Sequence, residues 1–194
     1  RPNHASRPFD EDRFEVSAHK WSALADEGRG VALLNDCKYG LNVEGNSLNL
    51  TLLKSPLAPD MSADKGRQEF TYALYAWNGP FAECGVVREA YELNCPVALV
   101  PGAAGECSLF QVDAPNVVIE TVKPAEDGSR DVVVRLYEAK RMSGRCTLCT
   151  ALPATGAAET NMLEEVQREL PLSGGALTLE FRPFEIKTIR LRMK

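Results

Sequence analysis

Alternation of apolar and polar side chains with a period of two dominates this sequence. It is clearest over residues 47–52, where Leu48, Leu50 and Leu52 alternate with polar residues. Because successive side chains of a strand point to opposite faces, the pattern predicts strands with one buried face. The same alternation, or a short apolar run, recurs at 14–19, 70–74, 117–122, 132–137, 146–152, 177–181 and 189–193.

Turn-forming residues separate these runs at short intervals. They occur at Gly28-Arg29-Gly30, Glu44-Gly45-Asn46, Asp127-Gly128 and Ser173-Gly174-Gly175. Glycine adopts positive φ without steric cost and Asn or Asp bonds its own backbone, so these positions favour tight turns. Many short strands at such spacing predict an all-β fold, an antiparallel β-sandwich.

Two segments have helical spacing instead. Residues 80–94 begin with Pro80 and are followed by Pro96, which indicates a short helix or an irregular crossover. Residues 162–170 carry apolar side chains at helical spacing, but they lie between predicted strands and lack a clear N-cap. Helix and strand both remain open for this segment, so we expect at most one or two short helices.

The segment Val100-Pro101-Gly102-Ala103-Ala104-Gly105-Glu106 resembles a connector in composition. We therefore predict two β subdomains packed together. Residues 1–104 would form the larger one and residues 105–194 a small terminal β-sandwich.

Composition excludes several classes of protein. The chain has 194 residues, 44% of them hydrophobic and 25% charged, with a net charge of -5 and no basic stretch, which argues against nucleic acid as a partner. Arg190, Arg192 and Lys194 alternate and indicate the solvated face of a last strand. No apolar run approaches membrane length, and we expect no signal peptide. Six irregularly spaced cysteines then indicate free thiols of a cytoplasmic protein.

The sequence offers little for metal binding or catalysis. Cys146-x-x-Cys149 is half of a zinc-ribbon pattern, but no second cysteine pair is present, and residues three apart on a strand diverge. His4 and His19 are the only histidines, and no nucleophile elbow or phosphate loop occurs. We predict no catalytic residue and no metal ligand in this chain.

The end of the apolar run at residues 30–34 is the best candidate for ligand contact. Asn35, Asp36, Lys38 and Tyr39 follow it directly, and their amide, carboxylate, ammonium and hydroxyl groups suit several sugar hydroxyls. The alternative is structural, with Asn35 and Asp36 forming an Asx-turn and Lys38 pairing locally.

His19 and Trp21 share one side of a predicted strand. An aromatic ring beside a hydrogen-bonding side chain is typical of a sugar-stacking platform, although a contact between domains explains the pair as well. Asp60 and Asp64 could bind a carbohydrate or a cation, or could simply form a polar turn.

Several segments together resemble a known family. They are Arg1-Pro2-Asn3-His4, the stretch 30–40, Glu69-Phe70-Thr71-Tyr72-Ala73-Leu74, the stretch 122–128 and the stretch 182–188, in family order. In these segments the chain resembles the C-terminal β region of glycoside hydrolase family 38, the α-mannosidases, in particular their cytosolic and bacterial branch.

This resemblance implies that the chain is a non-catalytic fragment of a retaining, zinc-dependent α-mannosidase that removes terminal α-linked mannose. Zinc and the nucleophilic Asp would lie in an N-terminal catalytic domain of the same polypeptide, so the fragment would be inactive alone. Its partners would be that domain, mannosides at the rim formed by residues 35–39, and further copies in a homo-oligomer. The alternative is a free-standing carbohydrate-binding module that uses Trp21, Trp77 and the tyrosines as stacking surfaces.

Overall fold

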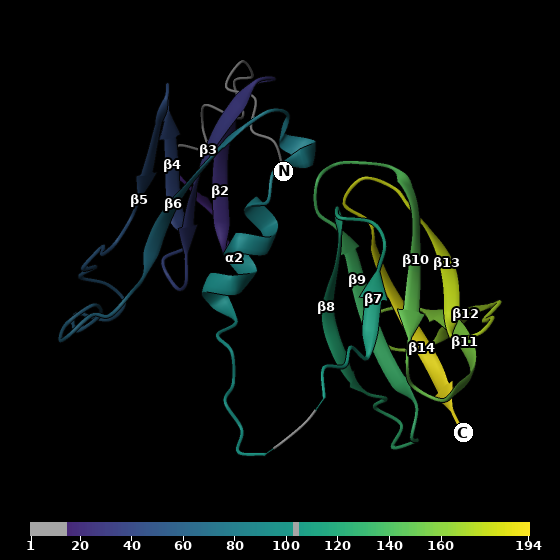
Figure 1. Cartoon of the computed structure of the whole chain (residues 1–194). Coiled ribbons are helices and arrows are strands. Elements are labelled where there is room, and N and C mark those ends of the chain that lie inside the picture. The colour runs from purple at the N-terminus through teal and green to yellow at the C-terminus, as the bar shows by residue number, and fades with distance from the viewer. Residues whose placement is uncertain (1–14, 103–104) are drawn as a thin grey trace. The chain divides into compact units, whose positions relative to one another are not determined.

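The computed structural model describes residues 15–102 and 105–194 and divides into two compact units, residues 1–100 and 101–194 (Figure 1). Strands dominate both units, and every strand pair is antiparallel. The predicted all-β fold is therefore confirmed. The change from one unit to the other falls in the connector segment that composition indicated; the packing of the two units against each other stays a prediction.

The first unit contains two three-stranded sheets. One has the order β2-β3-β6 and the other the order β1-β4-β5. The strands are β1 (Val16–Ser17), β2 (Trp21–Ala25), β3 (Arg29–Asn35), β4 (Gly40–Glu44), β5 (Ser47–Leu50) and β6 (Tyr72–Asn78). Gly45, at φ +58°, closes the β4–β5 hairpin, in the conformation for which the predicted turn needed glycine.

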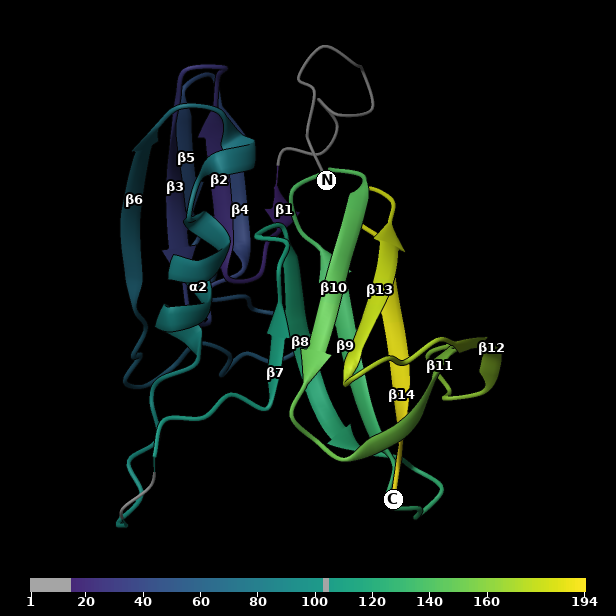
Figure 2. The ribbon, with the colours of Figure 1, turned by 45° about the vertical axis from the view of Figure 1, so that its right-hand side comes forward.

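A short helical segment follows β6, as residues 80–94 predicted. It consists of the 3₁₀ turn η1 (Phe81–Glu83) and the helix α2 (Val86–Asn94). Helix α2 buries Val86, Val87 and Ala90 and contacts β3 and β2, in front of which it lies in Figures 1 and 2. Within residues 15–102 and 105–194, neither helix has the length and apolar character required to cross a membrane.

Strand β6 forms where the alternation at 70–74 indicated, but its apolar stripe is not the buried one. Tyr72 and Leu74 are 55% and 75% exposed, while Trp77 on the opposite face is buried. The reason is the pairing with β3, which turns Tyr75 and Trp77 toward the side that η1 covers, where Trp77 contacts Phe81. The expectation that Tyr72 and Leu74 form the buried side of this strand is wrong for this unit taken alone.

The second unit is a sandwich of a five-stranded sheet, β12-β11-β14-β9-β8, and a three-stranded sheet, β13-β10-β7. In Figure 2, β10 and β13 lie in front of β9 and β14. The strands are β7 (Phe110–Val112), β8 (Val117–Pro124), β9 (Val132–Glu138), β10 (Gly144–Thr150), β11 (Ala154–Thr160), β12 (Val166–Leu170), β13 (Ala176–Phe181) and β14 (Ile186–Met193). Apolar side chains from both sheets, among them Leu136, Leu148 and Ile189, form one continuous core.

The segment 162–170 is a strand at its C-terminal end, β12, preceded by a turn. Glu164 in that turn has φ +66°, which ends any helical path. Helix and strand were both possible for residues 162–170, and the structure shows a turn followed by the strand β12.

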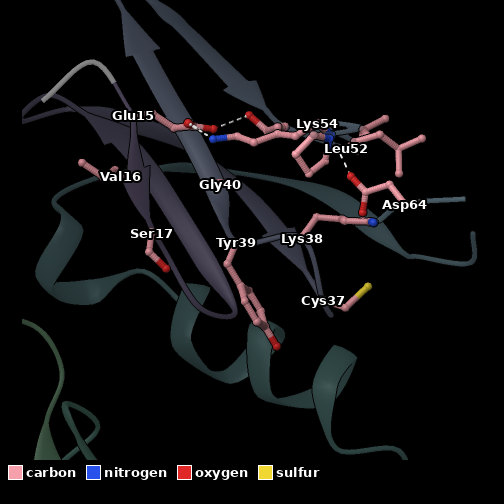
Figure 3. A pocket seen from close by; sticks show the side chains of 13 residues that line it. Glu15, Val16, Ser17, Cys37, Lys38, Tyr39, Gly40, Leu52, Lys54 and Asp64 are labelled. Atoms are coloured by element: carbon pink, nitrogen blue, oxygen red, sulfur yellow. Dashed lines mark hydrogen bonds and ion pairs between the residues drawn. The ribbon is translucent and has the colours of Figure 1, made fainter. Parts of the chain in front are cut away.

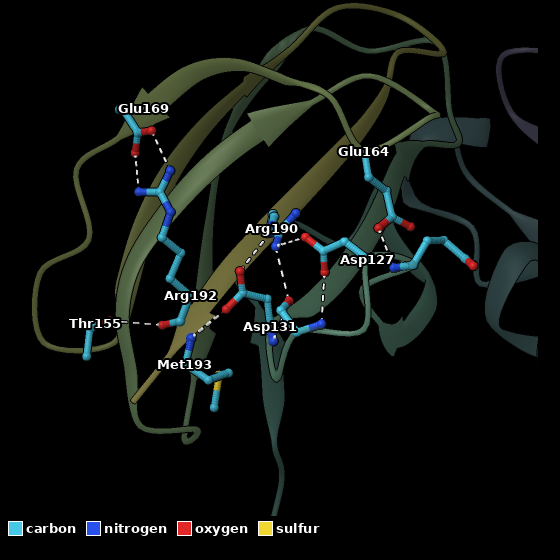
Figure 4. A network of polar contacts seen from close by, with 10 residues as sticks. Asp127, Asp131, Thr155, Glu164, Glu169, Arg190, Arg192 and Met193 are labelled. Carbon is cyan, nitrogen blue, oxygen red and sulfur yellow. Dashed lines mark hydrogen bonds and ion pairs between the residues drawn. The ribbon is translucent and has the colours of Figure 1, made fainter.

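Ion pairs on the outer face of β14 link neighbouring segments of this unit (Figure 4). Arg190 contacts Asp127 at 2.6 Å and Asp131 at 2.7 Å, both in the β8–β9 loop. Arg192 contacts Glu169 of β12 at 2.5 Å. Arg192 is 42% exposed, but Arg190 is only 16% exposed, so the prediction of a solvated face holds for Arg192 and not for Arg190. The charges of both arginines are paired within the protein.

Candidate functional site

A surface hollow of about 510 Å³ lies in the first unit, between β1, the start of β4 and the loop after β5 (Figure 3). It adjoins the end of β3, where the sequence placed the best candidate residues. Its lining consists of Glu15, Val16, Ser17, Cys37, Lys38, Tyr39, Gly40, Thr51, Leu52, Leu53, Lys54, Pro56 and Asp64.

One wall of the hollow carries a charged pair. The Lys54 Nζ lies 2.5 Å from Glu15 Oε2, and Thr51 Oγ1 donates to Glu15 Oε1 at 2.7 Å. These bonds, with Lys54 first, lower the pKa of Glu15, so this carboxylate is ionised at neutral pH. Both Lys54 and Glu15 keep hydrogen-bonding capacity toward solvent, since they are only partly covered.

Asp60 and Asp64 serve the loop that borders the hollow. Asp64 Oδ2 accepts from the backbone N–H groups of Ser55 at 2.9 Å and Lys54 at 3.0 Å, which lowers its pKa. Asp60 accepts from the amide and hydroxyl of Ser62. The carboxylates therefore stabilise two turns, as the structural alternative for these residues proposed.

Asn35 ends β3 inside the protein. It is 2% exposed; its N–H donates to the carbonyl of Lys20 at 2.9 Å, and its carbonyl accepts from Asn94 Nδ2 at 3.0 Å. Its side-chain Oδ1 is enclosed without a hydrogen-bond partner. Asn35 therefore joins β3 to α2 and does not present its amide to the hollow.

Asp36 connects the end of β3 to the start of β6. Both carboxylate oxygens lie 3.0 Å from the Thr71 amide, and the Asp36 amide donates to the Thr71 carbonyl at 3.2 Å. Hydrogen bonds from the Cys37 thiol and from Thr71 lower the pKa of Asp36, and the same thiol bond raises the pKa of Cys37. The Asx-turn alternative fails for Asp36, because this carboxylate bonds across the strand pair.

Lys38, Tyr39 and His19 lie at the surface beside this connection. The Lys38 Nζ lies 3.4 Å from Gln68 Oε1 and 5.2 Å from the centre of the Phe70 ring. The His19 and Tyr39 rings are both exposed, with centroids 4.2 Å apart. The Tyr39 hydroxyl donates to the carbonyl of Asp36 at 3.4 Å. Together these side chains present an ammonium group, an imidazole and a phenol to solvent.

Trp21 lies elsewhere in the unit. Its ring is 5.7 Å from that of Phe81, which in turn is 6.1 Å from Trp77. The structure thus brings together four of the six predicted contact residues, namely His19, Asp36, Lys38 and Tyr39. Sequence reasoning missed the wall formed by Glu15, Thr51 and Lys54, and the alternation at 47–52 was the one signal that a strand would lie there.

The described residues hold no group of three or more His, Cys, Asp or Glu side chains arranged to bind a metal. Cys146 is buried and Cys149 exposed on opposite faces of β10, and burial raises the pKa of Cys146 to about 11. His4 lies outside the described residues. The expectation that zinc is bound elsewhere in a longer enzyme stays a prediction.

Two family models match the chain. The model described as "Glycosyl hydrolases family 38 C-terminal domain" matches residues 1–62, and "Glycosyl hydrolases family 38 C-terminal beta sandwich domain" matches residues 116–189. The matches fall in the first and second unit, respectively, and together cover most of the chain.

Curated relatives and solved structures agree with these matches. The chain is 44% identical over 199 residues to alpha-mannosidase 2C1 of Homo sapiens and 36% identical over 202 residues to alpha-mannosidase G of Dictyostelium discoideum. These alignments cover 98% of this chain but 19% and 18% of the relatives, so the chain spans about a fifth of their length. An alpha-mannosidase from Enterococcus faecalis V583 has the same fold, with a TM-score of 0.73 at 22% identity, over 98% of this chain and 22% of that one. This chain belongs to glycosyl hydrolase family 38, in the C-terminal region of its α-mannosidases.

Proposed function

We propose that this chain is the non-catalytic C-terminal β-sandwich region of a retaining, zinc-dependent α-mannosidase and supports the part of the enzyme that cleaves terminal α-linked mannose. The proposal is carried by the two family-model matches, which fall in order on the two units. Retaining glycosidases hold two carboxyl groups roughly 5 Å apart across the sugar. The acidic side chains that surround the hollow are instead committed to Lys54 and to backbone amides, which supports a non-catalytic role.

We propose further that the hollow lies at the rim of the substrate cleft of the complete enzyme. Lys38 and Lys54 can donate to sugar hydroxyls, and Tyr39 offers a ring face as well as a hydroxyl. Asp36 would act as a positioning residue, since its bonds to Thr71 fix the backbone from which Lys38 and Tyr39 project.

A replacement experiment tests the supporting role. In human alpha-mannosidase 2C1 the aligned stretch is either deleted or exchanged for this chain, and hydrolysis of an aryl α-mannoside is measured with zinc present. We expect no turnover from this chain alone, loss of activity on deletion, and recovery in the chimera. Persistent turnover by the repurified chain alone, or a chimera as inactive as the deletion, would overturn the proposal.

Variants of the chimera test the rim. We expect Lys38→Ala and Tyr39→Ala to raise KM several-fold, about 1 kcal/mol in binding free energy, with kcat nearly unchanged. Lys65→Ala is the matched control, because Lys65 is exposed and does not line the hollow. An unchanged KM in both variants would show that the side chains of Lys38 and Tyr39 do not contact the substrate.

A free-standing carbohydrate-binding module is the second candidate, and the exposed His19–Tyr39 ring pair is the observation that favours it. Isothermal calorimetry of the chain with mannose oligomers separates the two functions. A support domain gives no heat of binding, whereas a binding module gives a saturable heat that His19→Ala abolishes.

We also propose a cytoplasmic location and assembly of the complete enzyme into a homo-oligomer. The location is supported by the six cysteines, all of which are free thiols. Cell fractionation tests the location, and light scattering of the chimera tests the assembly.

A further inference from the structure

Strand β6 has one exposed face, and Tyr72 and Leu74 make this face apolar. In the register with β3, Leu74 lies opposite Leu33 and Tyr72 opposite Asn35. Leu33 is buried, so the apolar surface that continues outward onto Leu74 of β6 begins inside the unit. There Leu74 is 75% exposed and Tyr72 55% exposed, and the Phe70 ring stacks on that of Tyr72 with centroids 6.4 Å apart.

The backbone of the same strand has an open edge. Hydrogen bonds from the Asp36 amide to the Thr71 carbonyl and from the Gly79 amide to the Gly28 carbonyl mark the bonded positions of the β3–β6 pair. In an antiparallel pair every second residue bonds to the partner, so residues 73, 75 and 77 bond to β3. The amides and carbonyls of residues 72, 74 and 76 therefore point away from β3, and in the described part of the chain β6 is the last strand of its sheet.

This edge lacks the protection found on the two edge strands of the five-stranded sheet in the second unit. The edge strand β12 carries Arg168 and Glu169, and the edge strand β8 ends in Lys123-Pro124. Charges and prolines of this kind prevent unwanted pairing of edge strands. The open positions of β6 are Tyr, Leu, Ala and Asn at residues 72, 74, 76 and 78, without a charge or a proline.

We propose that β6 is a docking strand, and that its open edge and its Tyr72–Leu74 face bind a β-strand with apolar side chains from the remainder of the α-mannosidase polypeptide. This inference rests on the proposed function. The bound strand would come from the part of the polypeptide that this chain does not include. In the curated relatives, about four fifths of the length lies outside the stretch that matches this chain. Strand addition satisfies the free amides of residues 72, 74 and 76, and the apolar side chains of the added strand cover Leu74.

Hydrogen exchange tests the backbone part of the proposal. In the chain alone, the amides of residues 72, 74 and 76 exchange rapidly, while those of 73, 75 and 77 are protected. In the chimera with human alpha-mannosidase 2C1, we expect the first set to be slowed by roughly 100-fold or more. Equal, rapid exchange of residues 72, 74 and 76 in both proteins would overturn the docking strand.

A matched pair of substitutions tests the side-chain part. Leu74→Glu and Leu163→Glu replace leucines that are 75% and 80% exposed, so neither is expected to shift the melting temperature of the chain alone. In the chimera, we expect Leu74→Glu to lower the yield of active enzyme by about 10-fold or more, because a carboxylate is then buried at the new contact. Leu163→Glu should leave it unchanged. A fully active Leu74→Glu chimera would contradict the proposal and leave the proposed function intact.

Two further results separate the docking strand from the proposed function and from self-association of this chain. If the wild-type chimera is inactive, the proposed function fails, while protection of residues 72, 74 and 76 in that same chimera still supports the docking strand. If light scattering shows that the chain alone dimerises and that Leu74→Glu restores the monomer, the occupant is a second copy, and the proposal is overturned.

Discussion

Glu138 ends β9 with a fully buried carboxylate, and its replacement gives the sharpest test of the second unit. The side chain is 0% exposed. Its Oε1 accepts from Asn116 Nδ2 at 2.9 Å and from the Lys140 amide at 2.8 Å, and its Oε2 accepts from the Phe184 amide at 3.0 Å. One carboxylate thus joins the segment before β8, the loop after β9 and the turn before β14.

Glu138→Gln keeps the shape of the side chain but puts an NH₂ group where one acceptor oxygen was. With that group at the Oε2 position, the Phe184 amide loses its acceptor and faces a second donor, while the two bonds to Oε1 lose their charge. A bond to a charged group contributes about 1.5–3 kcal/mol, and a buried unsatisfied donor costs a similar amount. We therefore expect the free energy of unfolding to fall by about 3 kcal/mol.

The effect should depend on pH. Burial by itself raises the pKa of Glu138, but the bonds from Phe184, Asn116 and Lys140 outweigh it and hold the pKa below 4.5. A carboxylate with a lowered folded-state pKa stabilises the fold above its unfolded pKa, and that stabilisation is lost as pH falls through the folded pKa. The difference between wild type and Glu138→Gln should thus be largest near neutral pH and shrink below 4.5.

Urea unfolding followed by far-ultraviolet circular dichroism, with hydrogen exchange of β9 and β14, measures this change in the second unit. Both tryptophans, Trp21 and Trp77, lie in the first unit, so their fluorescence reports on that unit. Glu180→Gln is the control, since Glu180 is 73% exposed in a surface pair with Arg145 and should cost at most about 0.5 kcal/mol. A loss below about 1 kcal/mol for Glu138→Gln, or one that is the same at all pH values, would refute the reasoning.

Three further changes have definite expected outcomes. Gly30→Ala places a Cβ 2.0 Å from the Trp77 ring, so we expect a loss of about 2 kcal/mol, measured by urea unfolding with tryptophan fluorescence. Arg190→Lys removes the planar fork that contacts Asp127 and a second carboxylate of the β8–β9 loop, and should cost about 1 kcal/mol by circular dichroism. Burial and a nearby acidic group raise the pKa of Tyr137 to about 12, so Tyr137→Phe should remove the last step of an ultraviolet titration.

The period-two alternation predicted strands well where the two faces of a strand differ in burial. The runs at 132–137 and 189–193 became β9 and β14, which contribute Val134, Leu136 and Ile189 to the core. Strand β11 was missed, because both of its faces are covered. Ala157 and Ala158 are consecutive and both buried, so its sequence has no apolar and polar sides to alternate.

The ambiguous segment 162–170 shows the opposite problem. Leu163 is 80% exposed and Val166 is 48% exposed, and of the three residues at helical spacing Leu170 alone packs against the core, so they do not define one buried face. Most of the stability of a helix in a protein comes from packing of its apolar face. Apolar residues at helical spacing therefore do not predict a helix when they have no surface to pack against. The pairing of β12 with β11 decided the outcome instead.

The candidate site was predictable only where its residues are neighbours in sequence. The abrupt change from apolar to polar residues placed Lys38 and Tyr39 correctly at a strand end. The wall formed by Glu15, Thr51 and Lys54 depends on contacts between segments distant in sequence, for example the bond from Thr51 Oγ1 to Glu15 Oε1 at 2.7 Å. The burial of Asn35 could not be read from its polar side chain, because the contact with Asn94 of α2 that encloses it is also distant in sequence.

Burial is distributed unevenly between the two units. Of the ten largest fully buried side chains, only Val86 belongs to the first unit; the others lie in the second. A chain segment with few buried side chains gains little hydrophobic stabilisation. Covering Leu74, which is 75% exposed, would add about 1–2 kcal/mol. Binding of the proposed strand at β6 would therefore stabilise the first unit. Under the proposed docking, the support between this region and the remainder of the enzyme would be reciprocal. The contact that covers the exposed face of β6 would also fix the position of the hollow relative to the docked strand.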